Sequence, residues 1–128
     1  MDPVHHFQLP ARDMAALKPF YEGVFGWQIQ EVPGMDYHLI ATVPTGPDGL
    51  PTVPGGINGG FYRPVPSGPG GVHLSICVDS LDGTLAKVQA GGGRVIMGKT
   101  PVGDFGFYAM VADPEGTPLG VWQDAKPQ

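Results

Sequence analysis

Residues 72–79 alternate between apolar and mixed side chains, which is the two-residue period of a β-strand. Apolar residues then recur at helical spacing over 81–90, so a helix is expected there. The apolar side of the strand is expected to pack beneath that helix, and the side that carries His73 must face elsewhere. The apolar side consists of Leu74, Ile76 and Val78.

The same order of elements occurs near the start of the chain. Residues 4–9 form a strand candidate, and Asp13 is a suitable N-cap for a helix that stops at Gly26. Pro19 interrupts the apolar stripe of this helix, so the helix either bends there or begins near Pro19.

The rest of the chain consists of short strands separated by segments rich in proline and glycine. The segment 44–56 is either a lid or a surface loop, and 64–71 has the composition of a linker. The remaining strands are expected at 27–32, 36–43, 57–63, 94–98, 105–112 and 118–123.

The two halves of the chain have the same internal spacing. His6 precedes Gly26 by 20 residues, and His73 precedes Gly93 by 20 residues. The sequence therefore predicts one α+β domain over 1–128, built of two tandem βαβββ modules at 4–63 and 72–123 with the linker 64–71 between them. Paired modules, within a chain or across a dimer, would form a curved mixed sheet, a cup with the helices outside.

Composition limits the function classes further. The chain has 128 residues, 41% of them apolar and 15% charged, with a net charge of −5 and no cluster of basic residues. This balance argues against nucleic-acid binding. The single cysteine, Cys77, is consistent with a reducing compartment, and neither a secretory signal nor a membrane-spanning run is recognised. We therefore expect a cytoplasmic protein with no nucleic-acid or membrane partner.

Several motifs resemble the vicinal oxygen chelate superfamily of glyoxalases, bleomycin-resistance proteins and extradiol dioxygenases. His6 followed by Asp13 and by Val24–Trp27 resembles the family's opening motif, and His73–Asp79 resembles the opening of its second module. Asp113-Pro114-Glu115-Gly116 resembles the turn before its last strand. The run Gly-Ile-Asn-Gly-Gly at 56–60 is similar to a glyoxalase-like subgroup of unsettled activity.

The resemblance implies a divalent metal held by histidines on the first strand of each module and by carboxylates on the last. His6 and His73 match the histidine positions, but Gly120 stands at the last-strand carboxylate position. Between Pro51 and Val72 there is no Asp, Glu or His, and Asn58 is the only amide. Two imidazoles alone would hold a divalent ion poorly, so no cofactor is predicted.

The expected function is binding of a small organic molecule in the cup, and a homodimer is implied by the resemblance. The protein could be a sequestering protein or a metal-independent enzyme, with His6 and His73 the best catalytic candidates. The alternative is a metal-dependent lyase, isomerase or dioxygenase that uses these histidines with non-standard ligands. Tyr37 and Tyr108 are expected in the core, and His5 is expected to point outward. The predicted ligand-binding residues are His6, Gln8, Asn58, His73, Ser75 and Trp122.

Overall fold

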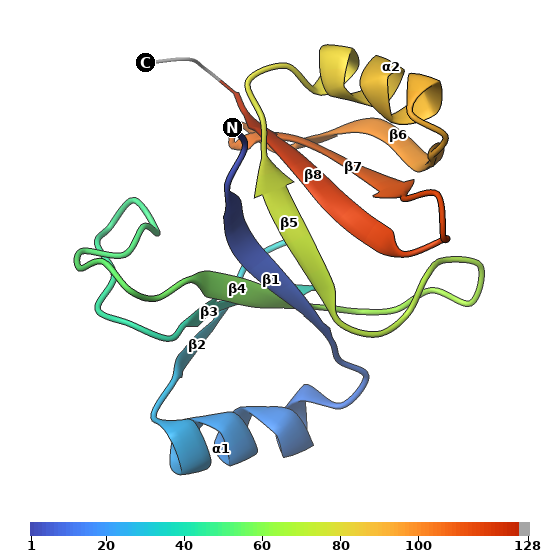
Figure 1. Cartoon of the computed structure of the whole chain (residues 1–128). Helices are drawn as coiled ribbons and strands as arrows, with labels where there is room; N and C mark the ends of the chain where they lie inside the picture. The colour runs from blue at the N-terminus through green and yellow to red at the C-terminus, as the bar shows by residue number, and fades with distance from the viewer. Residues whose placement is uncertain (126–128) are drawn as a thin grey trace. The chain divides into compact units, whose positions relative to one another are not determined.

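The computed structural model describes residues 1–125, so the last three residues of the predicted domain lie outside the described part. The predicted α+β class is confirmed (Figure 1). Neither helix in the described residues is long and apolar enough to cross a membrane. In chain order the elements are β1 (Val4–Pro10), α1 (Met14–Phe25), β2 (Gln28–Glu31), β3 (Tyr37–Ala41), β4 (Asn58–Tyr62), β5 (His73–Cys77), α2 (Leu81–Ala90), β6 (Arg94–Val102), β7 (Gly106–Ala112) and β8 (Pro118–Asp124).

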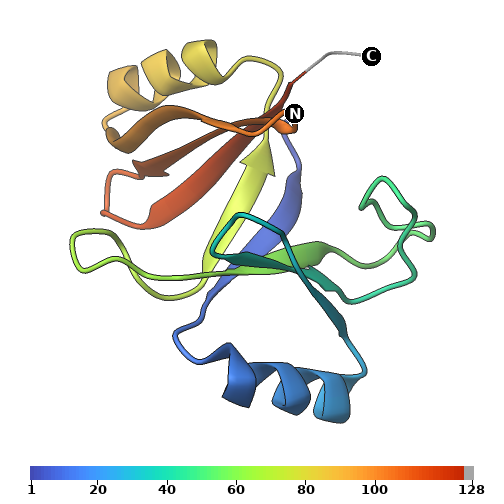
Figure 2. The same cartoon turned by 180° about the vertical axis from the view of Figure 1, so that it is seen from behind.

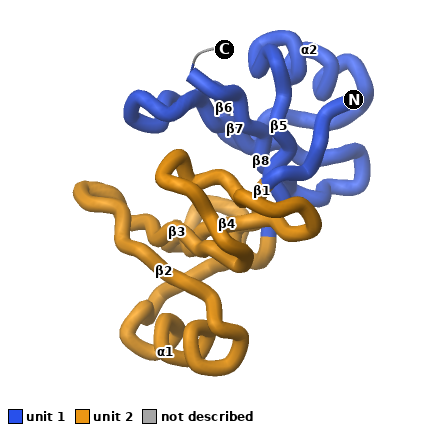
Figure 3. The backbone as a smooth tube through the Cα atoms, turned by 90° about the vertical axis from the view of Figure 1, so that its left-hand side faces the viewer, with its two compact units in different colours: residues 1–5, 73–128 blue, residues 6–72 orange. Residues whose placement is uncertain are grey.

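The chain divides into two compact units, which are coloured separately in Figure 3. Unit 2 is formed by His6–Val72. Unit 1 is formed by Met1–His5 together with the chain from His73 onward. The boundary falls inside β1, whose first residues belong to unit 1.

Unit 2 is a four-stranded sheet in the order β2-β3-β4-β1. β1 runs parallel to β4, and the other pairs are antiparallel. Figures 1 and 2 show α1 against one face of these strands. Phe7 and Leu9 pack into the cluster on that face, as expected from their alternation with the polar residues of β1. The buried members of this cluster are Ala11, Ile29, Ile40 and Phe61.

Helix α1 begins and ends where its capping residues predict. The Asp13 side chain accepts a hydrogen bond from the backbone N–H of Ala16, at 3.3 Å. Gly26 ends the helix in the left-handed conformation, with φ of 72°, which glycine adopts without steric cost. Pro19 lies inside one continuous helix, so the helix does not begin there.

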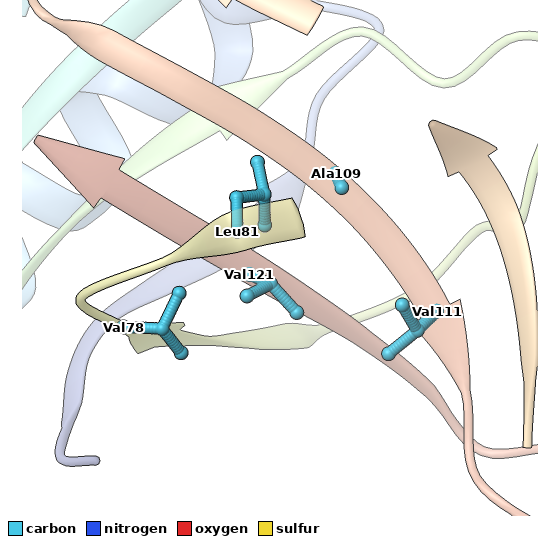
Figure 4. Close-up of a cluster of buried hydrophobic side chains, with 5 residues drawn as sticks. All are labelled: Val78, Leu81, Ala109, Val111 and Val121. Carbon is cyan, nitrogen blue, oxygen red and sulfur yellow. The ribbon is translucent and has the colours of Figure 1, made fainter. Parts of the chain in front are cut away.

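Unit 1 repeats this plan with the strand order β5-β8-β7-β6 and with α2 against one face. Figure 4 shows the buried centre of that face, to which β5, α2, β7 and β8 or their flanking residues contribute. Ile76 and Leu85 pack against it as expected. The expectation for Leu74 is wrong, because this side chain is 44% exposed. Leu74 lies one residue before the register of β5 with β8 begins, at Ser75.

Candidate ligand-binding faces of the two units

The face of unit 2 opposite α1 carries three polar side chains joined by hydrogen bonds. His6 and Gln8 alternate with Phe7 along β1, so they point away from the helix. The hydroxyl of Tyr37, from the start of β3, lies between them. It is 3.0 Å from Nε2 of His6 and donates to Oε1 of Gln8 at 3.0 Å. β3 therefore supplies the group that links two residues of β1.

The directions of these bonds assign a proton to His6. A phenol hydroxyl has one proton, and the Tyr37 proton goes to Gln8. With Oε1 of Gln8 facing Tyr37, the contact between Tyr37 and Nε2 of His6 is donated by the imidazole; a flipped Gln8 amide would reverse both bonds. In the first orientation Nε2 of His6 carries the ring hydrogen and has no lone pair for a metal ion.

Gly60 on β4 makes room for the Tyr37 ring. Gly60 pairs with Gln8 on one side and with Leu39 on the other, and it is buried. A Cβ atom at this position would overlap the hydroxyl and the ring of Tyr37. The position of the tyrosine therefore depends on a glycine beneath it.

Asn58 is buried and uses its amide to hold the chain that follows β3. Its Oδ1 accepts from the backbone N–H of Thr42 at 3.0 Å, and its Nδ2 donates to Oγ1 of Thr45 at 2.9 Å. These bonds fasten the start of the 44–56 loop to β4. The geometry gives Asn58 a structural task in addition to the ligand contact predicted for it.

In unit 1, His73 and Ser75 are buried, with 3% and 2% of their surfaces exposed. Ser75 pairs with Gly120 of β8, on the face opposite α2. Within the described residues, the buried Oγ of Ser75 has no hydrogen-bond partner. A buried hydroxyl without a partner is unusual in a folded protein.

Gly120 is closely surrounded by oxygen atoms of neighbouring side chains. A Cβ atom here would lie 2.5 Å from the hydroxyl oxygen of Tyr108 and 2.8 Å from Oγ of Ser75. Any larger side chain would have to displace these two groups. Tyr108 thus fills the space into which a carboxylate at position 120 would extend.

Trp122 lies on the same face, paired with Cys77 on one side and Tyr108 on the other. Its ring is half-buried, and its indole N–H donates to Oδ1 of Asp124 at 2.8 Å. Burial raises the pKa of the neighbouring Cys77 thiol, and the negative charges of Asp124, Asp79 and Asp2 raise this pKa further. The thiol is therefore a weak nucleophile at neutral pH.

The two units carry the same arrangement at equivalent positions. In each, a glycine of the last strand pairs with the residue two places after the first-strand histidine, and a tyrosine ring covers that glycine. The equivalent positions are His6 and His73, Gln8 and Ser75, Tyr37 and Tyr108, and Gly60 and Gly120. The register therefore identifies Gly60 as the counterpart of Gly120, an alignment that the spacing of the sequence did not fix.

Sequence reasoning missed the two tyrosines that organise these faces. Both were expected in the core, yet each places its hydroxyl on the sheet face opposite its helix. Tyr37 and Leu39 lie on one face of β3 and Ile40 lies on the other, and Ile40 is buried under α1. This alternation was a usable signal that Tyr37 faces away from the helix. His5, expected to point outward, is half-buried, and its Nδ1 lies 3.5 Å from the backbone oxygen of Ser75.

Comparison with known proteins identifies relatives along almost the whole chain. The family model described as "Glyoxalase/Bleomycin resistance protein/Dioxygenase superfamily" matches residues 4–121. The provisionally named glyoxylase CFP32 of Mycobacterium tuberculosis is 31% identical over 90% of this chain. The anthracycline biosynthesis protein DnrV of Streptomyces peucetius is 30% identical over 91% of this chain. The aligned region is 43% of the first relative and 45% of the second, so the chain spans less than half the length of these curated relatives.

Solved structures share the fold at low sequence identity. A superfamily member from Vibrio splendidus superposes with a TM-score of 0.62 at 16% identity, covering 97% of this chain and 99% of its own. Methylmalonyl-CoA epimerase from Mycobacterium tuberculosis superposes with a TM-score of 0.64 at 15% identity, covering 96% and 88%. At this identity the similarity shows the fold alone.

Proposed function

Since the chain belongs to the glyoxalase/bleomycin resistance protein/dioxygenase superfamily, we propose that it binds a small organic molecule without the divalent metal of its metal-dependent relatives. Binding would use polar side chains on the sheet face opposite the helix of each unit. Unit 2 would contribute His6 and Gln8, and unit 1 would contribute His73, Ser75 and Trp122.

The observation that carries this proposal is a glycine beneath a tyrosine at both last-strand positions. Gly60 lies beneath Tyr37, and Gly120 lies beside Tyr108 and Ser75. A carboxylate at either position would collide with these side chains. At these positions unit 2 offers His6 with Gly60 and unit 1 offers His73 with Gly120, so neither last-strand position supplies a carboxylate.

The remaining donors also fit a divalent metal poorly. Nε2 of His6 is engaged with the hydroxyl of Tyr37 at 3.0 Å, so this contact would have to break before the atom could bind a metal. Among residues 1–125, no group of three or more His, Cys, Asp and Glu side chains is arranged to hold a metal ion. The donor set therefore supports recognition by hydrogen bonds and apolar contact.

The hydrogen-bonded side chains of His6, Tyr37 and Gln8 would have different roles in a binding protein and in an enzyme. In a binding protein, its donors and acceptors orient a ligand over the sheet. In an enzyme, His6 would exchange a proton with the substrate while Tyr37 and Gln8 hold the ring in place. The two cases differ in one measurement, which is product formation.

The test begins with protein purified from its own host. Elemental analysis is expected to find far less than one zinc, nickel, manganese or iron per chain. Thermal shift with electrophilic dicarbonyls, aromatic diols and glycopeptides is then expected to give a hit that persists in EDTA. His6→Ala should weaken this hit, and a product assay on the same compound separates binding from catalysis.

Two results together would overturn the proposal: one metal per chain that is lost in His73→Ala, and a ligand response that EDTA abolishes. They would favour a metal-dependent lyase, isomerase or dioxygenase. The homodimer implied by the resemblance belongs to the same proposal. Light scattering of the purified protein is expected to give twice the mass of one chain.

A further inference from the structure

Helix α1 leaves a group of large apolar side chains uncovered in unit 2. Phe20, Val24 and Phe25 each expose 53–58% of their surface, and they lie outside the packed cluster beneath the helix. The two phenylalanine rings contact each other, with centroids 6.4 Å apart. These three residues are called the helix patch below. Contiguous exposed apolar side chains are typical of a contact surface.

The segment 42–57 between β3 and β4 is a second exposed apolar surface of unit 2. It projects beyond the strands (Figures 1 and 2) and contains four prolines. Its backbone has hydrogen bonds of its own, such as the 2.9 Å bond from the N–H of Gly46 to the oxygen of Leu50. Leu50 and Val53 nevertheless expose 58% and 46% of their surface. The segment, called the arm below, is therefore an ordered projection that presents apolar side chains.

Unit 1 lacks both the patch and the arm. When the first residues of α1 and α2 are aligned, the patch positions correspond to Lys87, Gly91 and Gly92. In place of the arm, the short turn 113–117 joins β7 to β8. The two units share one plan, so the fold itself requires neither feature. Their presence together in one unit and their absence together from the other links the arm to the patch.

The two surfaces also carry complementary charges. Lys18 is the only basic residue of α1, and it lies on the same side as Phe25 because seven residues make nearly two helical turns. The acid on that side, Glu22, accepts a hydrogen bond from the backbone N–H of Ile29 at 3.4 Å. Asp48 is the only charged residue of the arm. In the described part of the chain, neither Lys18 nor Asp48 forms an ion pair. The patch therefore has a cation beside it, and the arm carries an anion.

We propose that the arm of one copy docks on the helix patch of a second copy, and that two such contacts related by a two-fold axis form a dimer. The inference rests on the homodimer of the proposed function and names its interface. Both surfaces are exposed within one chain, so the arm does not cover the patch of its own unit. Docking of a proline-rich segment on aromatic rings is a recurring mode of recognition. Asp48 of one copy would then lie against Lys18 of the other.

The size of the surfaces requires both contacts. Two half-exposed phenylalanine rings offer roughly 150–250 Å² together, whereas a stable interface covers about 800 Å² on each partner. One arm on one patch falls short of this area. A two-fold pair doubles the contact and closes the assembly at two chains. Because the arm is already ordered, docking costs less conformational entropy.

The test is sedimentation equilibrium of the full chain from low to high micromolar concentration. Phe20→Lys gives α1 the residue that α2 has at this position, and Leu50→Ser removes an apolar contact of the arm. Each variant is expected to weaken the dimer at least about tenfold while its far-UV circular dichroism stays that of the unmodified protein. The matched control is Lys87→Glu on α2, which should leave dimerisation unchanged.

A mixture of the two variants tests the arm-on-patch contact directly. The intact arm of Phe20→Lys can dock on the intact patch of Leu50→Ser, so the mixed dimer is expected to be tighter than the dimer of either variant alone. Charge reversal gives a second test. Lys18→Glu and Asp48→Lys are each expected to weaken the dimer about threefold or more, and the double variant is expected to restore it.

A dimer that Phe20→Lys and Leu50→Ser leave unchanged would overturn this inference and leave the homodimer of the proposed function standing. Weakening by Phe20→Lys with no effect of Leu50→Ser would also overturn it, and would indicate contact between the helices themselves. A charge-reversed double variant that stays as weak as its single variants would count against docking of the arm at Lys18. An unmodified protein that is monomeric at every concentration would overturn both the interface and the homodimer.

Discussion

Replacing Tyr37 with phenylalanine removes the hydroxyl that links His6 to Gln8. Both contacts of this hydroxyl are 3.0 Å long, and a typical hydrogen bond contributes about 0.5–1.5 kcal/mol net. The three side chains are only partly buried, so water can replace part of what is lost. We therefore expect a decrease of about 1–2 kcal/mol in the free energy of unfolding. For a chain of this size that corresponds to roughly 3–8 °C in the melting temperature.

The matched control is Tyr21→Phe in α1. Tyr21 stacks on Trp27, with ring centroids 5.1 Å apart, and no hydrogen bond of its hydroxyl is found within the described part of the chain. Losing this hydroxyl should change the free energy of unfolding by less than about 0.5 kcal/mol. The difference between the two variants then measures the linking role of Tyr37 rather than the loss of any tyrosine hydroxyl.

The decisive assay is the tautomer of His6, read from the ring ¹⁵N signals at a pH where the ring is neutral. The bond directions predict that Nε2 carries the hydrogen. Gln8→Leu removes the acceptor of the Tyr37 proton, so this hydroxyl is then expected to donate to Nε2 and shift the hydrogen to Nδ1. A His6 ring that already has Nε2 deprotonated in the unmodified protein, or one that keeps its tautomer in Gln8→Leu, would refute the assignment.

Three further predictions concern packing and reactivity. Leu81→Ala should cost about 2–5 kcal/mol in chemical unfolding because the side chain is fully buried, whereas Met14→Ala at the equivalent helix position should cost clearly less because Met14 is only partly buried; equal costs would contradict this reasoning. Gly120→Ala should destabilise by about 1–3 kcal/mol, and a smaller penalty is expected in the Tyr108→Phe background; an equal penalty in both backgrounds would show that the tyrosine hydroxyl does not fill this space. Because its pKa is raised, Cys77 should react with a thiol reagent more slowly than a free cysteine at pH 7–8. The reaction rate should increase only as the pH rises above the usual thiol range. A pH profile in which the rate reaches half of its maximum below about pH 8 would refute this.

The sequence by itself determined the elements and the direction in which most of them face. Asp13 and Gly26 marked the two ends of α1 because a side-chain acceptor and a left-handed glycine act on the nearest turn of backbone. The alternation of Phe7 with His6 and Gln8 separated the helix side from the opposite side of β1. These signals are local, since strand period and helix capping depend on residues only a few positions apart.

Tertiary structure decided what depends on register between distant strands. Only the pairing of Gln8 with Gly60 and of Ser75 with Gly120 showed that both last-strand positions are glycines covered by tyrosines. The prediction for Leu74 was wrong for the same kind of reason, because its alternation is the same as that of Ile76 but only Ile76 packs against the buried cluster of unit 1. A side chain's face follows from the period of its own strand, but its neighbours follow from hydrogen-bond registers fixed by residues far away in the chain.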